Sequence, residues 1–384
     1  MSHSLSHRRV WDSGCMTSTD ELKRRINRAA ELLRDGGQVA LIATPGADLR
    51  YLCGHDVHLT ERITALLVRA EGEPVLVTPA LERPSADSSP VRELGIEIVE
   101  WRETEDPYAV ITGLLDGPKV SVSDRMWAQH LFGLHRAAEL HPASAANLMA
   151  ELRMRKSTEE IEALRRAAHA IDSVHAQLDR WLAPGRTENE VAADIARAII
   201  DSGHLSVDFV IVGSGPNGAS PHHEASDRVI ETGDPVVVDI GGTMPDGYCS
   251  DSTRTYLAGR EPTEEITALY AVLQHAQAAA ASFVHPGVTA EEIDRVAREV
   301  ITEAGYGEQF IHRTGHGIGL ESHEPPYIVA GNRLQIDAGM AFSIEPGIYL
   351  AGRFGARVED IVVAADNGVD ILNQSPRELR VIGG

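Results

Sequence analysis

The sequence of 384 residues has only three cysteines, Cys15, Cys53 and Cys249, and none lies close to another. An odd number of cysteines without a Cys-x-x-Cys pair argues against both a disulfide framework and a thiolate zinc site. Few, unpaired cysteines are typical of proteins kept in a reducing compartment. We therefore expect a cytoplasmic location.

The chain also lacks any run of 18 apolar residues, which argues against a membrane-spanning helix. Its first segment, "MSHSLSHRRVWDSGC", has no apolar core of the kind that a signal peptide needs. We interpret residues 1–18 as a disordered leader. Whether translation starts at Met1 or at Met16 stays open.

Basic residues are scarce relative to acidic ones: 35 lysines and arginines stand against 57 aspartates and glutamates, for a net charge of −22. Such a surface repels nucleic acid and anionic membranes, so we expect neither as a partner. Part of the acidic excess can instead be carboxylates gathered around bound cations. The rest of the composition, 43% hydrophobic and 24% charged, is that of a globular protein with an apolar core.

The length favours two domains. In residues 19–150 a capped amphipathic helix, "STDELKRRINRAAELLRDGG", precedes five strand-like segments separated by turns and short helical pieces, which predicts a mostly parallel α/β domain. A long helical stretch interrupted near Lys156 and Ser157 follows, and the second domain is placed at residues 155–384. The first domain has one cluster of titratable residues, which we interpret as a loop: Asp48, His55, Asp56 and His58.

The second domain contains an internal repeat. "WLAPGRTENEVAADIARAIIDSGH" at 181–204 aligns without a gap with "FVHPGVTAEEIDRVAREVITEAGY" at 283–306. Each copy predicts a capped amphipathic helix closed by a glycine, then a strand, a glycine-rich turn and a histidine. The two histidines are His222 and His323.

Extending the repeat places two pairs of acids at equivalent positions. Asp239 in "VVVDIGG" matches Glu345 in "AFSIEPG", and Asp251 in "YCSDSTRTYL" matches Glu359 in "GARVEDIVV". A pseudo-two-fold axis would bring all four together, although each acid alone is typical of a structural, hydrogen-bonded carboxylate. Four converging carboxylates repel one another strongly, and two divalent cations would cancel that charge.

A single imidazole joins this set. His316 lies in "GHGIGLESHEPP", which we interpret as a metal-binding turn whose glycines let the backbone approach metal and substrate. Oxygen ligands with one imidazole suit Mn²⁺ or Co²⁺ and are compatible with Zn²⁺ or Fe²⁺. Two such ions acidify a shared water, which predicts a metal-bridging hydroxide. The segment "GSGPNG" matches a dinucleotide-binding pattern, but no helical period follows it, so we reject that function.

Four side chains are candidates for direct roles in catalysis. His222 and His323 are each typical of structural histidines when taken alone, yet their related positions favour donation to an oxyanion or a leaving amine. Glu345 can also accept a proton from the metal-bound water. Arg357, two residues before Glu359, can order a ligand carboxylate. His223 points elsewhere if its segment is extended.

These motifs resemble the pita-bread metallopeptidases, in particular the Xaa-Pro dipeptidase (prolidase) and aminopeptidase P branch. Five positions match the family's metal ligands in order: Asp239, Asp251, His316, Glu345 and Glu359. The resemblance covers about residues 155–384, and the preceding α/β region resembles a creatinase-like domain more weakly. It implies a dinuclear site, a homodimer and cleavage of the bond before proline in a dipeptide or short peptide.

The resemblance also implies that His222 handles a proton or the substrate amide and that His323 polarises the scissile carbonyl. Tyr327 stands where some prolidases have an arginine that holds the substrate carboxylate. Dipeptidase and aminopeptidase activity therefore both stay open, as does hydrolysis of a small non-peptide amide or ester. A metal-free binding module is disfavoured because all five ligand positions are filled. The native metal, the residue preferred before proline and the physiological role stay undetermined.

Overall fold

The computed structural model describes residues 17–383. The leader predicted at residues 1–18 therefore lies outside the described residues, apart from its last two positions. One of these, Ser18, caps the first helix, since its hydroxyl accepts a hydrogen bond from the backbone N–H of Glu21. The alternative start at Met16 also falls outside the description.

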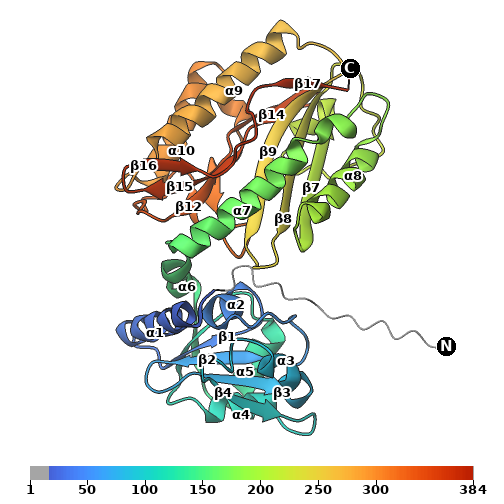
Figure 1. Cartoon of the computed structure of the whole chain (residues 1–384). Helices are drawn as coiled ribbons and strands as arrows, with labels where there is room; N and C mark the ends of the chain where they lie inside the picture. The colour runs from blue at the N-terminus through green and yellow to red at the C-terminus, as the bar shows by residue number, and fades with distance from the viewer. Residues whose placement is uncertain (1–16, 384) are drawn as a thin grey trace, which may run out of the picture.

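The N-terminal domain is a six-stranded sheet in the order β4-β3-β2-β1-β5-β6, with helices packed on it (Figure 1). Three of its strand pairs are parallel and two, β1–β2 and β2–β3, are antiparallel. The elements are α1 (Thr19–Asp35), β1 (Ala40–Ala43), α2 (Ala47–Cys53), β2 (Ala65–Arg69), β3 (Val75–Pro79), α3 (Arg83–Asp87), β4 (Glu97–Trp101), α4 (Pro107–Gly113), β5 (Lys119–Val122), α5 (Ala128–Ala137) and β6 (His141–Ser144).

The mostly parallel α/β sheet and its first five strands were predicted from the sequence, but two details differ. Strand β6 has the sequence "HPAS", with no apolar run and an internal proline, and it forms only by pairing beside β5 at the sheet edge. Asp48, predicted in a loop, lies in the first turn of α2, whereas His55, Asp56 and His58 follow that helix without regular structure.

The C-terminal domain has two main sheets, in the orders β17-β9-β8-β7 and β11-β10-β12-β15-β16, with the β13–β14 hairpin beside them. Its helices, seen in Figure 1 on the outside of these sheets, are α7 (Thr158–His175), α8 (Glu188–Asp201), α9 (Glu264–Phe283) and α10 (Ala290–Glu303). Its strands are β7 (Ser206–Ser214), β8 (Pro235–Thr243), β9 (Cys249–Ala258), β10 (Gly315–Gly317), β11 (Glu324–Ile328), β12 (Ala341–Ile344), β13 (Gly347–Leu350), β14 (Phe354–Arg357), β15 (Asp360–Ala365), β16 (Gly368–Ile371) and β17 (Arg380–Ile382).

The internal repeat is present in the fold. Helices α8 and α10 begin after Thr187 and Thr289, and each threonine forms a capping box with a glutamate three residues later. Each helix contacts a longer partner, α7 for α8 and α9 for α10, and each pair packs over its own apolar cluster. The two halves of the domain therefore share both their helix-capping residues and the way in which their helices pack.

Helix α6 (Ala146–Arg153) connects the two domains, and α7 begins after the predicted interruption. Ser157 starts α7 with another capping box, formed with Glu160. Arg153 then joins the domains, because its guanidinium lies 3.1 Å from Asp48 of α2 and 2.9 Å from Glu321. These partly buried charge pairs connect α2 of the first domain with the second domain.

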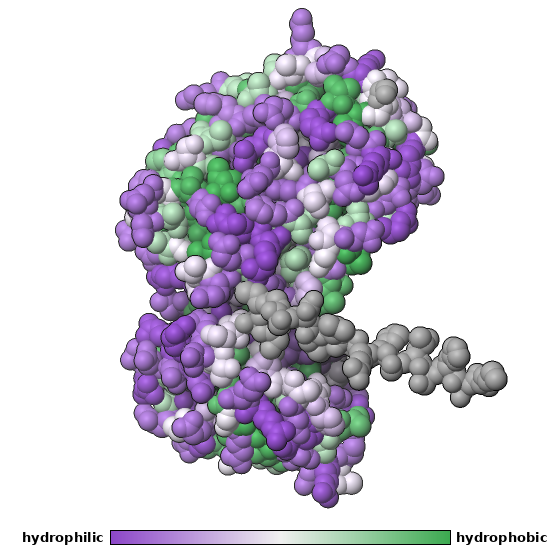
Figure 2. Space-filling model, in the orientation of Figure 1, coloured by the Kyte–Doolittle hydropathy of each residue, from purple (hydrophilic) through white to green (hydrophobic). Residues whose placement is uncertain are grey.

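The surface is mostly hydrophilic, as the charged composition of the chain predicts. Hydrophilic residues cover most of the face drawn in Figure 2, and the apolar residues on it form small, separate groups. Among residues 17–383, no helix combines the length and the apolar character required to cross a bilayer.

Candidate metal centre

Two antiparallel strands provide the first two acids. In the β8–β9 pair Asp239 lies opposite Thr253, and Gly241 lies opposite Asp251. Because side chains alternate between the faces of a strand, the two carboxylates project from the same face on a diagonal. Both strands are buried along their length, so the two acids lie in the interior of the domain.

The second half of the repeat provides three more side chains. His316 is in β10, Glu345 directly follows β12, and Glu359 lies in the short link between β14 and β15. The prediction that His316 lies in a turn is wrong, because "GHG" is a buried strand that pairs with β11 and β12. Its glycines are needed for close strand packing: a Cβ on Gly315 would lie 1.9 Å from the Ser343 carbonyl oxygen, and one on Gly317 would lie 2.3 Å from that of Pro325.

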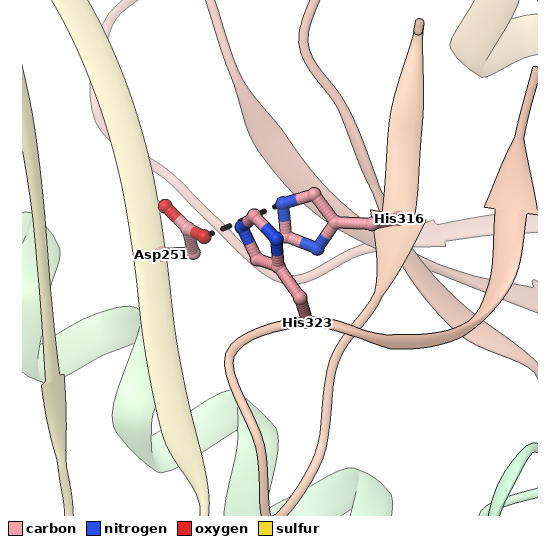
Figure 3. A group of neighbouring side chains, drawn as sticks. All are labelled: Asp251, His316 and His323. Atoms are coloured by element: carbon pink, nitrogen blue, oxygen red, sulfur yellow. Dashed lines mark ion pairs between the residues drawn. The ribbon is translucent and has the colours of Figure 1, made fainter. Parts of the chain in front are cut away.

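The fold brings all five predicted ligand positions together. Potential ligand atoms lie within 4.8 Å of one another in three overlapping groups: Asp239, Asp251 and Glu359; His316, Glu345 and Glu359; and Asp251, His316 and His323. Figure 3 shows the last group, with the two imidazoles side by side facing the Asp251 carboxylate from β9. The shared members Asp251, His316 and Glu359 make this one continuous cluster.

The backbone orients the imidazole of His316. Its Nδ1 lies 3.1 Å from the Gly317 carbonyl oxygen, which can only accept, so Nδ1 carries the proton. Nε2 then faces the cluster, 3.2 Å from Glu345 Oε1 and 3.7 Å from Asp251 Oδ2. It is the nitrogen that a metal ion would use.

Electrostatics favour a cation in this cluster. Burial, followed by repulsion from neighbouring carboxylates, raises the pKa of Asp251 and Glu359 well above the usual range. Burial also raises the pKa of Asp239, against the opposing charge of Arg357. Burial acts to raise the pKa of Glu345 too, but its hydrogen bond and charge interaction with His316 lower it overall.

Two carboxylate oxygens are buried without any hydrogen-bond partner, Asp239 Oδ1 and Glu359 Oε1. Buried acceptors of this kind are rare and costly in native proteins. Oxygen donors with one imidazole are the ligand set that divalent cations of intermediate hardness prefer. The residues present therefore fit divalent metal ions, which would use both orphaned oxygens.

Arg357 lies at the edge of the cluster. Its Nη2 donates to Asp239 Oδ2 at 2.5 Å, and its Nε donates to Thr253 Oγ1 at 3.1 Å. Thr253 in turn donates to Glu359 Oε2 at 2.7 Å. One arginine thus orients two carboxylates, which leaves their other oxygens directed into the cluster.

The two candidate catalytic histidines lie beside this centre. The His323 ring is 3.8 Å from that of His316, centre to centre, and Arg313 Nη2 lies 3.0 Å from its Nδ1. Arginine can only donate, so Nδ1 accepts and Nε2 carries the proton of the neutral ring. Loss of hydration, followed by the charges of His316 and Arg313, lowers the pKa of His323 to about 4. His222 is exposed and near enough to influence the titration of His323.

Contacts on both sides hold the His222 loop, and the sequence analysis missed them. Glu188 is fully buried at the start of α8 and accepts hydrogen bonds from the backbone and hydroxyl of Ser214, at 2.8 and 2.7 Å, and from Ser226. It also pairs with His223 Nε2 at 2.8 Å. The carbonyl of Pro221 accepts from Arg357 at 3.3 Å. The only sequence signal was a glutamate in a first helical turn, which normally indicates a favourable dipole contact.

Replacing Glu188 with glutamine should lower the free energy of unfolding by about 2 kcal/mol, because an amide NH₂ would face N–H and O–H donors. It should also reduce turnover about tenfold, since His222 loses its support.

The stabilisation by Glu188 should depend on pH. Burial acts to raise the pKa of Glu188, but hydrogen bonds led by that of Ser214 lower it overall. The contribution of Glu188 to the free energy of unfolding is therefore present above the usual carboxylate range and is lost as pH falls through the lowered pKa. Denaturant titrations at several pH values measure this loss.

Glu190→Gln is the matched control, because Glu190 lies on the same helix, is exposed, and caps Thr187 in a way that glutamine also allows. Equal effects of the two substitutions would contradict the assigned role of Glu188.

A cavity of about 370 Å³ lies between the two domains, and His323, next to His316, is part of its lining. Its N-terminal wall includes residues 44–48 and 123–125, and its C-terminal wall includes Glu321, His323 and Tyr327. A space of this size accommodates a small ligand. A ligand in the cavity would therefore contact the candidate site at His323.

Comparison with known proteins agrees with this site. Residues 162–366 match the profile of metallopeptidase family M24, and residues 25–155 match that of the creatinase/prolidase N-terminal domain. The chain belongs to metallopeptidase family M24. As an M24 protein it is a metal-dependent peptidase with a creatinase-like N-terminal domain and a pita-bread catalytic domain, as the motifs predicted.

Similarity extends over nearly the whole chain. A probable dipeptidase PepE from Mycobacterium tuberculosis is 51% identical over 361 residues, which cover 94% of this chain and 96% of that protein. An Xaa-Pro dipeptidase from Lactobacillus helveticus is 36% identical, over 93% of this chain and 98% of that one. The crystal structure of dipeptidase PepE from Mycobacterium ulcerans superposes with a TM-score of 0.91 at 50% identity, covering 96% of this chain and all of that one.

Proposed function

We propose that this M24 metallopeptidase is an Xaa-Pro dipeptidase that uses two divalent metal ions, Mn²⁺ or Co²⁺. The observation that carries the proposal is the buried cluster of four carboxylates and one imidazole with two orphaned oxygens. Support for the substrate comes from the 36% identical relative named an Xaa-Pro dipeptidase. We further propose that the protein is cytoplasmic, which agrees with the buried free thiols of Cys53 and Cys249. We also propose that it forms a homodimer.

The ligands would be Asp239, Asp251, His316, Glu345 and Glu359. Two divalent ions bound there would act as Lewis acids that bring the pKa of a coordinated water close to neutrality. Without them, burial and then the mutual repulsion of the carboxylates raise the pKa values of Asp251 and Glu359.

The chain's own residues would then act on the peptide. Glu345 would accept the proton of the attacking water. His323, neutral and protonated at Nε2, would donate to the scissile carbonyl oxygen as negative charge develops there. His222 would contact the leaving nitrogen. Arg357 would keep the Asp239 carboxylate in place throughout.

The test is peptide hydrolysis by protein stripped of metal and reloaded with Mn²⁺. Ala-Pro, Ala-Pro-Ala and Ala-Ala are compared under the same conditions. The proposal predicts cleavage of Ala-Pro, with little cleavage of the other two. Efficient cleavage of Ala-Pro-Ala would instead establish aminopeptidase P activity, and no cleavage of any peptide would favour a non-peptide amide or ester as substrate.

A further inference from the structure

Arg313 lies three residues before His316 and reaches the wall that carries the catalytic histidine. Its side chain is half-buried, and its Nη2 lies 3.0 Å from His323 Nδ1. The centre of its guanidinium lies 4.6 Å from the centre of the Tyr327 ring. Strands β10 and β11 pair with His316 opposite Tyr327, so the chain just before β10 places Arg313 over that ring.

The guanidinium has no acidic partner. Among residues 17–383, no aspartate or glutamate oxygen lies within 4.0 Å of Arg313, although the other arginines near the site, Arg153 and Arg357, both form ion pairs. A chain of net charge −22 offers many carboxylates, so an unpaired arginine at the site is unexpected. One of its five N–H groups bonds to His323, and the rest are available to a ligand.

The covalent geometry of an Xaa-Pro dipeptide brings its carboxylate to this place. The carboxyl carbon is two bonds from the scissile nitrogen, with an N–Cα bond of about 1.46 Å and a Cα–C bond of about 1.52 Å. The group that binds the carboxylate must therefore lie next to the group that contacts the scissile amide. Arg313 meets this condition, because it already touches His323.

We propose that Arg313 binds the free C-terminal carboxylate of the substrate and so selects dipeptides over longer peptides. This inference rests on the proposed Xaa-Pro dipeptidase function. In a longer peptide the same position carries a neutral amide, which cannot form a charge-assisted, bidentate pair with a guanidinium. Tyr327 contributes its ring face, which fixes the plane of the guanidinium and keeps its outer edge directed to the ligand.

The proposal is tested with Arg313→Met, which removes the charge and keeps most of the length, and with Arg313→Lys. The kcat/KM for Ala-Pro should fall about 100-fold in the methionine variant, mainly through KM, because carboxylate binding is the same in the ground and transition states. The kcat/KM for Ala-Pro-amide should fall much less, because this substrate has no carboxylate to lose and is affected only through the hydrogen bond from Arg313 to His323. Lysine should restore part of the loss, since it supplies charge without the planar fork.

A control and a binding measurement complete the test. Arg333→Met removes an exposed arginine that is not part of the site, and it should match the wild type on both substrates. Calorimetry on the Mn²⁺-loaded protein should show that the wild type binds L-proline at least about tenfold more tightly than Arg313→Met does, with no such difference for L-prolinamide.

An equal loss on Ala-Pro and Ala-Pro-amide would overturn the proposal, because Arg313 would then act only by orienting His323. Unchanged kinetics on both substrates would overturn it as well. A wild-type protein that cleaves no Ala-Pro would refute the proposed function itself. This result is distinguishable from a failure of the Arg313 proposal, because it does not depend on the variants.

Discussion

Asp251→Asn should bind fewer metal ions than the wild type and lose at least about 10³-fold in kcat for Ala-Pro, because a bound cation contributes several kcal/mol to charge stabilisation. Asp251 belongs to two of the three ligand groups, so we expect its loss to affect both metal positions. Metal content is measured by mass spectrometry after reloading and desalting. Unchanged metal content would remove Asp251 from the ligand set.

In the metal-free protein, the same substitution should not lower the free energy of unfolding and should even raise it at high pH. The pKa of Asp251 is raised in the folded state, so its ionisation costs stability, and that cost grows as pH rises above the usual carboxylate value of about 4. Asparagine removes the charge, so the chelated variant should be at least as stable as the chelated wild type at pH 8. Mn²⁺ at 100 times its Kd should stabilise the wild type by about 2.7 kcal/mol per site and the variant by less.

His323→Ala should lower kcat by about 10² to 10⁴-fold while the protein keeps its metal, which is the effect expected for one lost donor to the developing oxyanion. The metal should stay because the other ligand groups do not include His323. Thermal unfolding should change little, since the side chain is exposed on the cavity wall. The measurement is kcat for Ala-Pro together with metal content in the same preparation.

Two results would contradict this role for His323. Loss of one metal equivalent would make it a ligand, which its approach to Asp251 and His316 allows. A rate near that of the wild type would return it to a structural side chain. His323→Gln, whose amide can also donate, should recover part of the rate if donation is its function.

Much of the candidate site could be predicted because its signals are local. A carboxylate in an apolar strand such as "VVVDIGG" needs a compensating partner, so Asp239 stands out without any structure. The two repeat helices are marked by their own capping boxes and glycines, which depend on neighbours within a few residues. Equivalent acids in the two halves follow from that alignment.

The surroundings of those residues could not be predicted. Strand β10 has only three residues, two of them glycine, and it exists because β11 and β12 pair with it. Nothing local distinguishes such a strand from a turn. Glu188 matters because Ser214 and Ser226, which are distant in sequence, donate hydrogen bonds to it. Arg313 matters because no acidic side chain among residues 17–383 pairs with it. These are properties of packing, which composition and periodicity do not encode.

The two-metal site is best tested by titrating Mn²⁺ into protein stripped with a chelator while Ala-Pro hydrolysis is followed. We expect no measurable hydrolysis in the chelator and a rate that rises with added metal until two ions are bound per chain. Hydrolysis that persists in the chelator, or a rate that is already maximal with one ion per chain, would contradict the two-metal site.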